Sequence, residues 1–120
     1  MTPTELTGVV AEHIAAVNAE DTAAIVATFA PDAYVNDVRR EFTGAAAIRR
    51  WVAKEVTGDH LRIDVRKVLD HHGDTIVRGA YDGAFDKSAL DGELVLTNYF
   101  SVRDGKIASL VVIRNQPAEY

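Results

Sequence analysis

Apolar residues in the first half of the chain recur at the spacing of helices. A first helix is predicted to begin at Thr4, after Pro3, and its buried stripe is formed by Leu6, Val9, Val10, His13, Ile14 and Val17. Asp21 is expected to cap a second helix that ends before Pro31. A third helix is predicted to open at Thr43 and Gly44 and to close at Gly58.

Strand patterns occupy the second half of the chain. A short strand over 33–38 precedes the third helix, and further strands are expected over 61–69, 75–85, 93–102 and 107–114, with turns at 72–74 and 104–105. Helices followed by a run of hairpins predict one α+β domain over 1–120, with three N-terminal helices packed on one face of an antiparallel sheet. A strongly curved sheet around these helices would form a cone that encloses an apolar pocket.

Composition narrows the classes of function. The 13 Lys and Arg and 18 Asp and Glu residues give a net charge of −5, which disfavours nucleic acid as a partner. No cysteine is present, so thiolate chemistry is excluded. The sequence has no long apolar run and no leader-like start, so we expect no membrane partner and a cytoplasmic protein. His71 and His72 would point to opposite faces of a strand, so we predict no metal site. The sequence has no phosphate-cradling glycine loop, so we predict no cofactor.

Three polar residues interrupt apolar rows and are the candidate catalytic groups. His13 lies within the stripe of the first helix, Asn98 within an apolar row of its strand, and Asp37 faces inward with the strand that carries it. Each also has a structural interpretation. The histidine could bond a backbone carbonyl, the amide could be satisfied within the core, and the carboxylate could pair with Arg39 or Arg40.

Five further residues are expected to line the pocket of the cone: Val17, Val35, Trp51, Tyr81 and Phe100. The strand over 75–85 leaves open which of Tyr81 and Asp82 faces the pocket, because adjacent residues point to opposite faces. The face shared by Val77, Gly79 and Tyr81 is the more apolar one, which favours an inward Tyr81.

Several segments resemble the nuclear transport factor 2-like superfamily, in its SnoaL-like and ketosteroid isomerase-like branch. They are 11–17, 21–26, 29–33, 35–37, the G-x-x-A-I segment of 44–48, and the F-x-V-x-D-G-K-I segment of 100–107. The resemblance covers nearly the whole chain. It implies the cone-shaped α+β fold, described as cystatin-like, and a homodimer through the outer face of the sheet.

The resemblance also implies roles for the three polar residues. The general-base aspartate of ketosteroid isomerases falls on Asp37, the oxyanion-hole tyrosine on His13, and the second oxyanion donor, a protonated aspartate, on Asn98. Histidine and asparagine retain hydrogen-bond donors but change their acidity. The implied activity is therefore acid/base chemistry of this general type rather than steroid isomerisation itself.

We expect a small cofactor-independent enzyme, of isomerase, cyclase or dehydratase type, that acts on an apolar carbonyl-bearing or polycyclic molecule. Asp37 would abstract a proton next to the carbonyl, while Asn98 and His13 would donate hydrogen bonds to the developing oxyanion. One alternative is a non-catalytic module for hydrophobic-ligand binding or dimerisation, in which His13 and Asp37 satisfy each other. Another is an epoxide hydrolase-like enzyme, which requires Asp82 to face the pocket.

Overall fold

The computed structural model describes residues 2–88, 90 and 92–115 and contains three helices, one π-helical turn and seven strands. The elements follow one another in the order β1 (Thr2–Pro3), α1 (Gly8–Asn18), α2 (Thr22–Ala27), β2 (Phe29–Asp37), β3 (Arg40–Thr43), α3 (Ala45–Trp51), the π-helical turn η1 (Val52–Val56), β4 (Arg62–His71), β5 (Asp74–Asp82), β6 (Leu94–Arg103) and β7 (Lys106–Arg114). The α+β class and the three helices before the main hairpins were predicted correctly.

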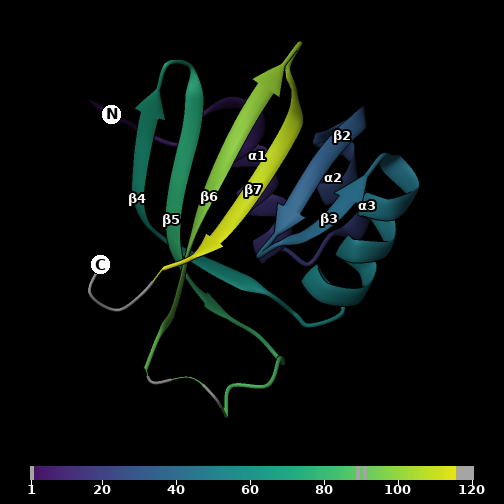
Figure 1. Cartoon of the computed structure of the whole chain (residues 1–120), viewed down its shortest axis with the longest axis vertical. Coiled ribbons are helices and arrows are strands. Elements are labelled where there is room, and N and C mark those ends of the chain that lie inside the picture. The colour runs from purple at the N-terminus through teal and green to yellow at the C-terminus, as the bar shows by residue number, and fades with distance from the viewer. Residues whose placement is uncertain (1, 89, 91, 116–120) are drawn as a thin grey trace.

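All seven strands form one sheet, in the order β1-β4-β5-β6-β7-β2-β3 (Figure 1). The expectation of a purely antiparallel sheet is wrong at one pair, because β2 lies parallel to β7, with Val35 opposite Leu110. The chain passes through α3 and four further strands between these two partners, and this long connection permits the parallel pairing. Through it, the carboxyl end of β2 lies beside β7, with Asp37 opposite Val112.

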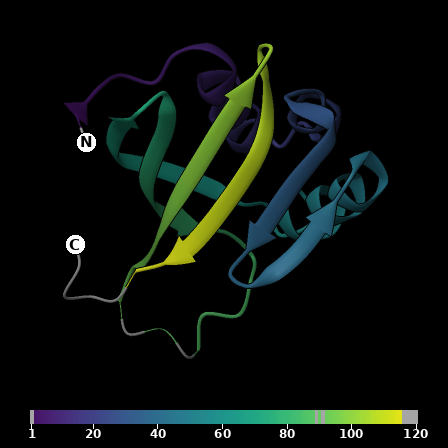
Figure 2. The ribbon, with the colours of Figure 1, turned by 45° about the horizontal axis from the view of Figure 1, so that its top comes forward.

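The sheet curves strongly, and β4 swings round behind β6 and β7 (Figure 2). The helices α1 and α2 lie behind the sheet in the view of Figure 1, while α3 flanks β2 and β3. No described helix covers the opposite face, where Tyr99 is 40% and Ile113 47% exposed. The homodimer expected through this outer face stays a prediction.

Several element boundaries differ from the expected ones. The first helix begins at Gly8 with Thr7 as its N-cap, not at Thr4, because Thr2 and Pro3 pair with β4 as β1 and the Thr4 N–H donates to the Val68 carbonyl of β4. Asp21 caps α2 as predicted, its Oδ1 accepting a 3.0 Å bond from the Ala24 N–H. The strand β2 begins before Pro31, and the β2–β7 register shifts between Phe29 and Tyr34 around this proline, which has no N–H to donate.

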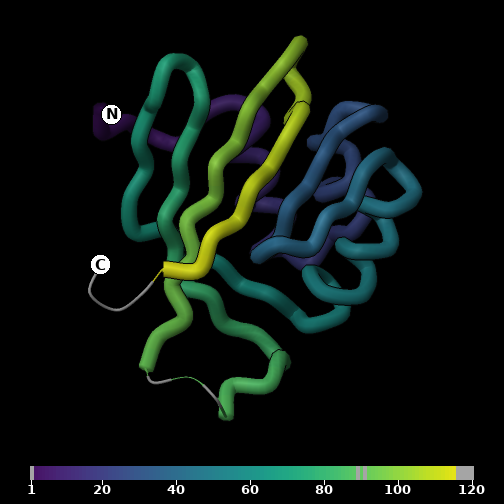
Figure 3. Tube along the Cα trace, in the orientation of Figure 1, coloured from purple at the N-terminus to yellow at the C-terminus, as the bar shows by residue number. Residues whose placement is uncertain are grey.

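The connection between β5 and β6 reaches away from the body of the sheet (Figure 3). It begins after Asp82 and returns to the sheet at Leu94. Phe85, near its start, contributes to the wall of the cavity described below. This connection therefore helps to define the open end of the cone.

Candidate active site

A cavity of about 320 Å³ lies between the inner face of the sheet, α1 and the segment formed by α3 and η1. Most of its wall is apolar and includes Val17, Val56, Leu61, Ile63, Leu96, Leu110 and Val112. The polar and charged members are His13, Asp37, Arg40, Glu55, Asp59, Tyr81, Asn98 and Arg114. An apolar cavity of this size with a few polar groups is typical of a site for a small molecule.

Asp37 lies at the end of β2, with its side chain on the cavity wall. Both of its side-chain hydrogen bonds are accepted by Oδ2, at 3.1 Å from the Trp51 Nε1–H and at 2.8 Å from the Arg40 guanidinium. Within the described residues, Oδ1 accepts no hydrogen bond. The carboxylate is thus held by one oxygen, which leaves the other available to a ligand.

Arg40 links Asp37 to a second carboxylate. Its guanidinium lies 2.8 Å from Asp37 Oδ2 and 2.7 Å from Glu55 Oε1. Burial opposes the charge of Arg40, and the two carboxylates outweigh that effect and raise its pKa above the usual value. The structural interpretation of Asp37 as an ion-pair partner is therefore correct for Arg40, alongside its position on the cavity wall.

His13 is only 4% exposed, and its hydrogen bonds determine its tautomer. The Thr28 hydroxyl donates its single proton to the Ile25 carbonyl at 2.6 Å, so it accepts at 3.0 Å from the His13 Nδ1–H. Burial lowers the pKa of His13 to about 4, so the ring is neutral at pH 7. A neutral ring with its proton on Nδ1 carries a lone pair on Nε2.

Two expectations for His13 do not fit this arrangement. A neutral ring with its proton on Nδ1 offers an acceptor at Nε2, so the expected donor role towards an oxyanion does not apply to this nitrogen. His13 and Asp37 also do not satisfy each other, because the histidine bonds Thr28 while the aspartate bonds Trp51 and Arg40. The reason in both cases is the Thr28 hydroxyl, which already accepts the hydrogen bond from the imidazole Nδ1–H.

Asn98 lies on the cavity wall in the middle of β6, and its amide is fixed by two bonds. Its Oδ1 accepts from the Tyr81 hydroxyl at 2.9 Å, and its Nδ2 donates to the Val77 carbonyl at 3.3 Å. Burial raises the pKa of Tyr81 far above its usual value; the bond to Asn98 opposes this shift and the charge of Asp37 adds to it. The phenol therefore stays protonated, and the second N–H of Asn98 is available as a donor.

The π-helical turn η1 and the residue before it supply three residues of the cavity wall. In η1 the hydrogen bonds reach back five residues, as in the 2.8 Å bond from the Thr57 N–H to the Val52 carbonyl. This widened turn presents Trp51, Glu55 and Val56 to the cavity together. Such π-helical turns are rare in proteins, and those that do occur are often found at functional sites.

The five expected pocket residues divide into two groups. Val17, Trp51 and Tyr81 line the cavity. Val35 and Phe100 do not, because they are fully buried in the core behind its wall, where the Phe100 ring packs edge-on against the His13 imidazole at 5.4 Å. Their inward direction along the strands was predicted correctly, but period-two reasoning cannot tell the wall of a cavity from the core beneath it.

The orientation of β5 answers the question left open for Tyr81 and Asp82. Tyr81 faces the cavity, whereas the Asp82 side chain is 75% exposed and pairs with Lys87 at 2.5 Å. Two hydrogen bonds, from Lys87 and from the Gly83 N–H, lower the pKa of this exposed carboxyl. The epoxide hydrolase-like alternative required an inward Asp82, and this orientation contradicts it.

Sequence reasoning did not find four polar participants: Thr28, Glu55, Asp59 and Arg114. Nothing in the sequence marks Thr28 as the partner of His13, fifteen residues away. Glu55 and Arg114 carried a usable signal, since one follows Trp51 by a helical turn and the other continues the inward row of Leu110 and Val112. The described residues contain no group of three or more metal-binding side chains, and none of their helices is long and apolar enough to cross a membrane.

Comparisons with known proteins agree with this architecture. The profile of the SnoaL-like domain family matches residues 10–110. A proposed polyketide cyclase from Sinorhizobium meliloti is 30% identical, with a TM-score of 0.79 over 90% of this chain and 95% of that one. SalBIII, an epoxide hydrolase/cyclase-like enzyme with a role in pyran ring formation in the polyether salinomycin, is 23% identical, with a TM-score of 0.77 over 90% and 88% of the two chains.

A third similar structure is a proposed ketosteroid isomerase from Kribbella flavida, 15% identical, with a TM-score of 0.73 over 90% of this chain and 76% of that one. No curated protein matches the sequence. The two structures below 25% identity are similar in fold alone, whereas the family profile spans most of the chain, including His13, Asp37 and Asn98. The chain therefore belongs to the SnoaL-like domain family, within the nuclear transport factor 2-like superfamily.

Proposed function

We propose that the protein is a small cofactor-independent enzyme, of isomerase, cyclase or dehydratase type, that abstracts a proton next to the carbonyl group of an apolar or polycyclic molecule. The observation that carries this proposal is the state of Asp37 on the cavity wall. Two donors hold its Oδ2, and its Oδ1 has no partner among the described residues. A carboxylate that is oriented in this way and faces an apolar cavity is suited to general-base catalysis.

The proton transfer would proceed in two balanced steps. Asp37 Oδ1 takes a proton from the carbon next to the carbonyl, and the electron pair of the broken C–H bond moves to the carbonyl oxygen, which becomes an enolate. The same carboxyl then returns the proton to carbon, at the original or at a conjugated position. The free N–H of Asn98 stabilises the enolate oxygen, a contribution of about 3 kcal/mol for one well-placed donor.

Tyr81 and His13 would have supporting roles in this reaction. The Tyr81 hydroxyl, by donating to Asn98 Oδ1, orients the amide so that its N–H groups point away from that bond. His13 Nε2 is an acceptor and would accept a hydrogen bond from a hydroxyl group of the substrate. The apolar wall excludes water and strengthens these polar contacts.

The test is exchange of carbon-bound hydrogen with solvent, because every reaction type named above begins with the same proton abstraction. The C1 protons of the bicyclic ketone 2-tetralone are followed by NMR in D2O, with and without the protein. We expect wild type to accelerate exchange over buffer and Asp37→Asn to abolish that acceleration. Asparagine keeps an oxygen for Trp51 and Arg40, so the variant changes the base with little change in shape.

Asp82→Asn is the matched control, because it makes the same substitution at a carboxylate that lies outside the cavity. It should exchange 2-tetralone at the wild-type rate. Full exchange activity in Asp37→Asn would reject Asp37 as the base.

The second candidate is a non-catalytic module that binds a hydrophobic small molecule. The specific observation in its favour is the Arg40 ion pair, since a carboxylate that is bound by a guanidinium can have a purely structural role. On this alternative, 2-tetralone would bind in the cavity without faster exchange, and Asp37→Asn would bind it as well as wild type does.

A further inference from the structure

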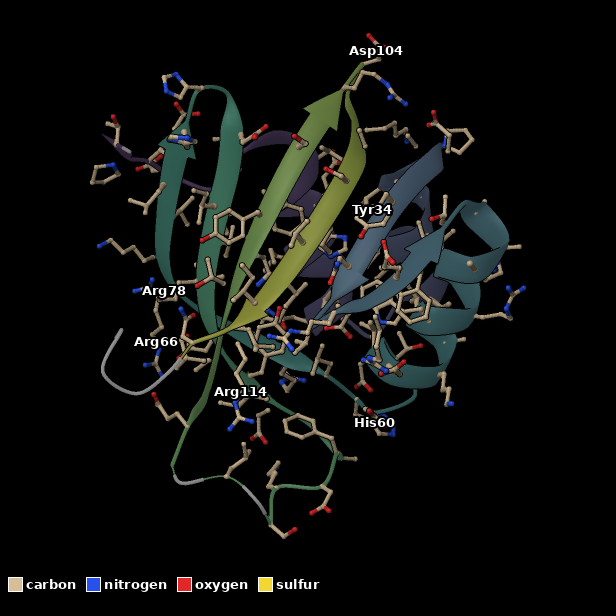
Figure 4. All side chains as sticks on the ribbon, viewed as in Figure 1. Tyr34, His60, Arg66, Arg78, Asp104 and Arg114 are labelled. Carbon is tan, nitrogen blue, oxygen red and sulfur yellow. The ribbon has the colours of Figure 1, made fainter. Side chains whose placement is uncertain are left out.

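Arg114 occupies an inward-facing position at the end of β7. The strand alternates, and its inner face carries Leu110, Val112 and Arg114, all three on the cavity wall. The first two are buried, whereas Arg114 lies at the exposed end of the row, at the lower end of β7 in Figure 4. An arginine that continues an apolar row extends its aliphatic stem along the wall and places its guanidinium at the opening.

The guanidinium of Arg114 has no carboxylate partner among the described residues. The other cation of the cavity wall differs from it in this respect, because Arg40 is bound by both Asp37 and Glu55. The remaining carboxylate of the wall, Asp59, lies beyond ion-pair distance of Arg114 within the same described part of the chain. Arg114 is therefore the wall's available cation.

The position of Arg114 relative to Asn98 sets a distance between two ligand groups. In the β6–β7 ladder, Asn98 lies opposite Val112, and Arg114 is two residues further along β7, roughly 7 Å at the usual rise per residue. A carbonyl at Asn98 and an anionic group at Arg114 can therefore belong to one molecule with a mono- or bicyclic skeleton. The planar guanidinium matches a carboxylate in two parallel hydrogen bonds.

We infer that Arg114 is a specificity-determining residue that binds a carboxylate of the substrate, which makes the substrate class an apolar carbonyl compound that carries an acid group at its far end. This inference rests on the proposed function, since it concerns the same cavity. The net charge of −5 does not oppose it, because at physiological ionic strength charges farther than about 8 Å away are largely screened. The nearby guanidinium of Arg114 therefore determines whether the cavity favours an anionic or a neutral ligand.

The test compares two ligands that differ only in charge, 2-naphthoate and 2-naphthamide, by titration calorimetry. The indole N–H signal of Trp51, the chain's one tryptophan and a member of the cavity wall, reports by NMR whether each ligand binds there. In wild type we expect 2-naphthoate to bind at least tenfold more tightly than 2-naphthamide. The preference should weaken as salt is raised.

Arg114→Met keeps an unbranched apolar stem and removes the guanidinium with its charge. It should remove the preference for 2-naphthoate and leave binding of 2-naphthamide within threefold of wild type. Arg49→Met is the matched control, because Arg49 is exposed on α3, away from the cavity, and this variant should keep the preference. Equal binding of the two ligands by wild type, absence of binding by both, or a preference that survives Arg114→Met would each overturn the inference.

The failure of this inference and the failure of the proposed function are distinguishable. A preference for 2-naphthoate that depends on Arg114, in a protein that does not accelerate 2-tetralone exchange, would support the carboxylate site and reject proton abstraction. Exchange that depends on Asp37, without any preference for 2-naphthoate, would do the reverse.

Discussion

The indole Nε1 of Trp51 donates a 3.1 Å hydrogen bond to Oδ2 of Asp37, fourteen residues earlier in the chain. The bond joins the last residue of α3 to the last residue of β2, and Arg40 donates to the same oxygen. Two donors on one oxygen restrict rotation of the carboxylate. Trp51 thus acts on the proposed base by positioning it, without itself taking part in proton transfer.

Trp51→Phe removes this donor and keeps an aromatic ring in the wall. The carboxylate would then be held by Arg40 alone, and Asp37 Oδ1 would sample more orientations. We expect the exchange rate at saturating 2-tetralone to fall by roughly tenfold or more, because small displacements of a reacting group have large effects on rate. The dissociation constant of the ketone, measured by calorimetry, should change less than threefold.

Phe42→Leu is the control for this variant. Phe42 packs against the Trp51 ring at a centroid distance of 5.9 Å and donates nothing to Asp37. Its truncation disturbs the packing of the indole and leaves the hydrogen bond in place, so exchange should remain within threefold of wild type. A Trp51→Phe variant with the wild-type saturated rate would show that the indole N–H does not position the base.

The sequence was sufficient to predict towards which face of its helix or strand each candidate side chain points. His13, Asp37 and Asn98 interrupt apolar rows, and all three lie on the wall of one cavity. The direction of their hydrogen bonds could not be predicted, because it depends on partners from other elements. His13 donates a hydrogen bond to Thr28, and no local sequence pattern connects these two residues.

The fold shows the same division between local and long-range information. Turns and hairpins follow from neighbouring residues, so the order β4-β5-β6-β7 was predictable. The parallel pairing of β2 with β7 joins Val35 to Leu110 and is set by how the whole sheet closes around the helices. The π-helical turn after Trp51 also has no sequence signal that we recognised.

Gly79 of β5 pairs with Val65 of β4, and the side chain of the cavity residue Ile63 packs closely against it. A Cβ atom at this position would lie 2.7 Å from Ile63 Cγ2 and 3.2 Å from the Asp64 carbonyl oxygen. Gly79→Ala therefore overpacks the wall, and we expect it to lower the free energy of unfolding by about 1–3 kcal/mol, as measured by urea denaturation.

A second substitution tests whether the Ile63 contact causes this loss. Leucine has no Cγ2 branch at its Cβ, so Ile63→Leu removes the atom closest to the new methyl group. The double variant Gly79→Ala/Ile63→Leu should recover part of the stability that Gly79→Ala loses, relative to Ile63→Leu alone. Equal losses in both backgrounds would assign the effect to the backbone of Asp64 instead.

The buried imidazole of His13 makes stability depend on pH. Burial lowers its pKa to about 4 in the native state, against about 6.5 when the chain is unfolded. Between these values the unfolded state binds more protons than the native state, so stability is complete above pH 6.5 and is lost as the pH falls towards 4. The shift corresponds to about 3 kcal/mol, and urea denaturation at intervals from pH 7.5 to 4 measures it.

His13→Phe isolates this contribution, because phenylalanine cannot titrate and preserves a ring between Phe29 and Phe100, which pack against the imidazole at 5.3 and 5.4 Å. Carboxylates elsewhere titrate in both proteins, so the difference between the two stability curves belongs to His13. We expect wild type to lose about 3 kcal/mol more than His13→Phe between pH 6.5 and 4. Parallel curves for wild type and His13→Phe would mean that the buried ring accepts a proton in the native state, and the assignment of His13 Nε2 as a neutral acceptor would then be wrong.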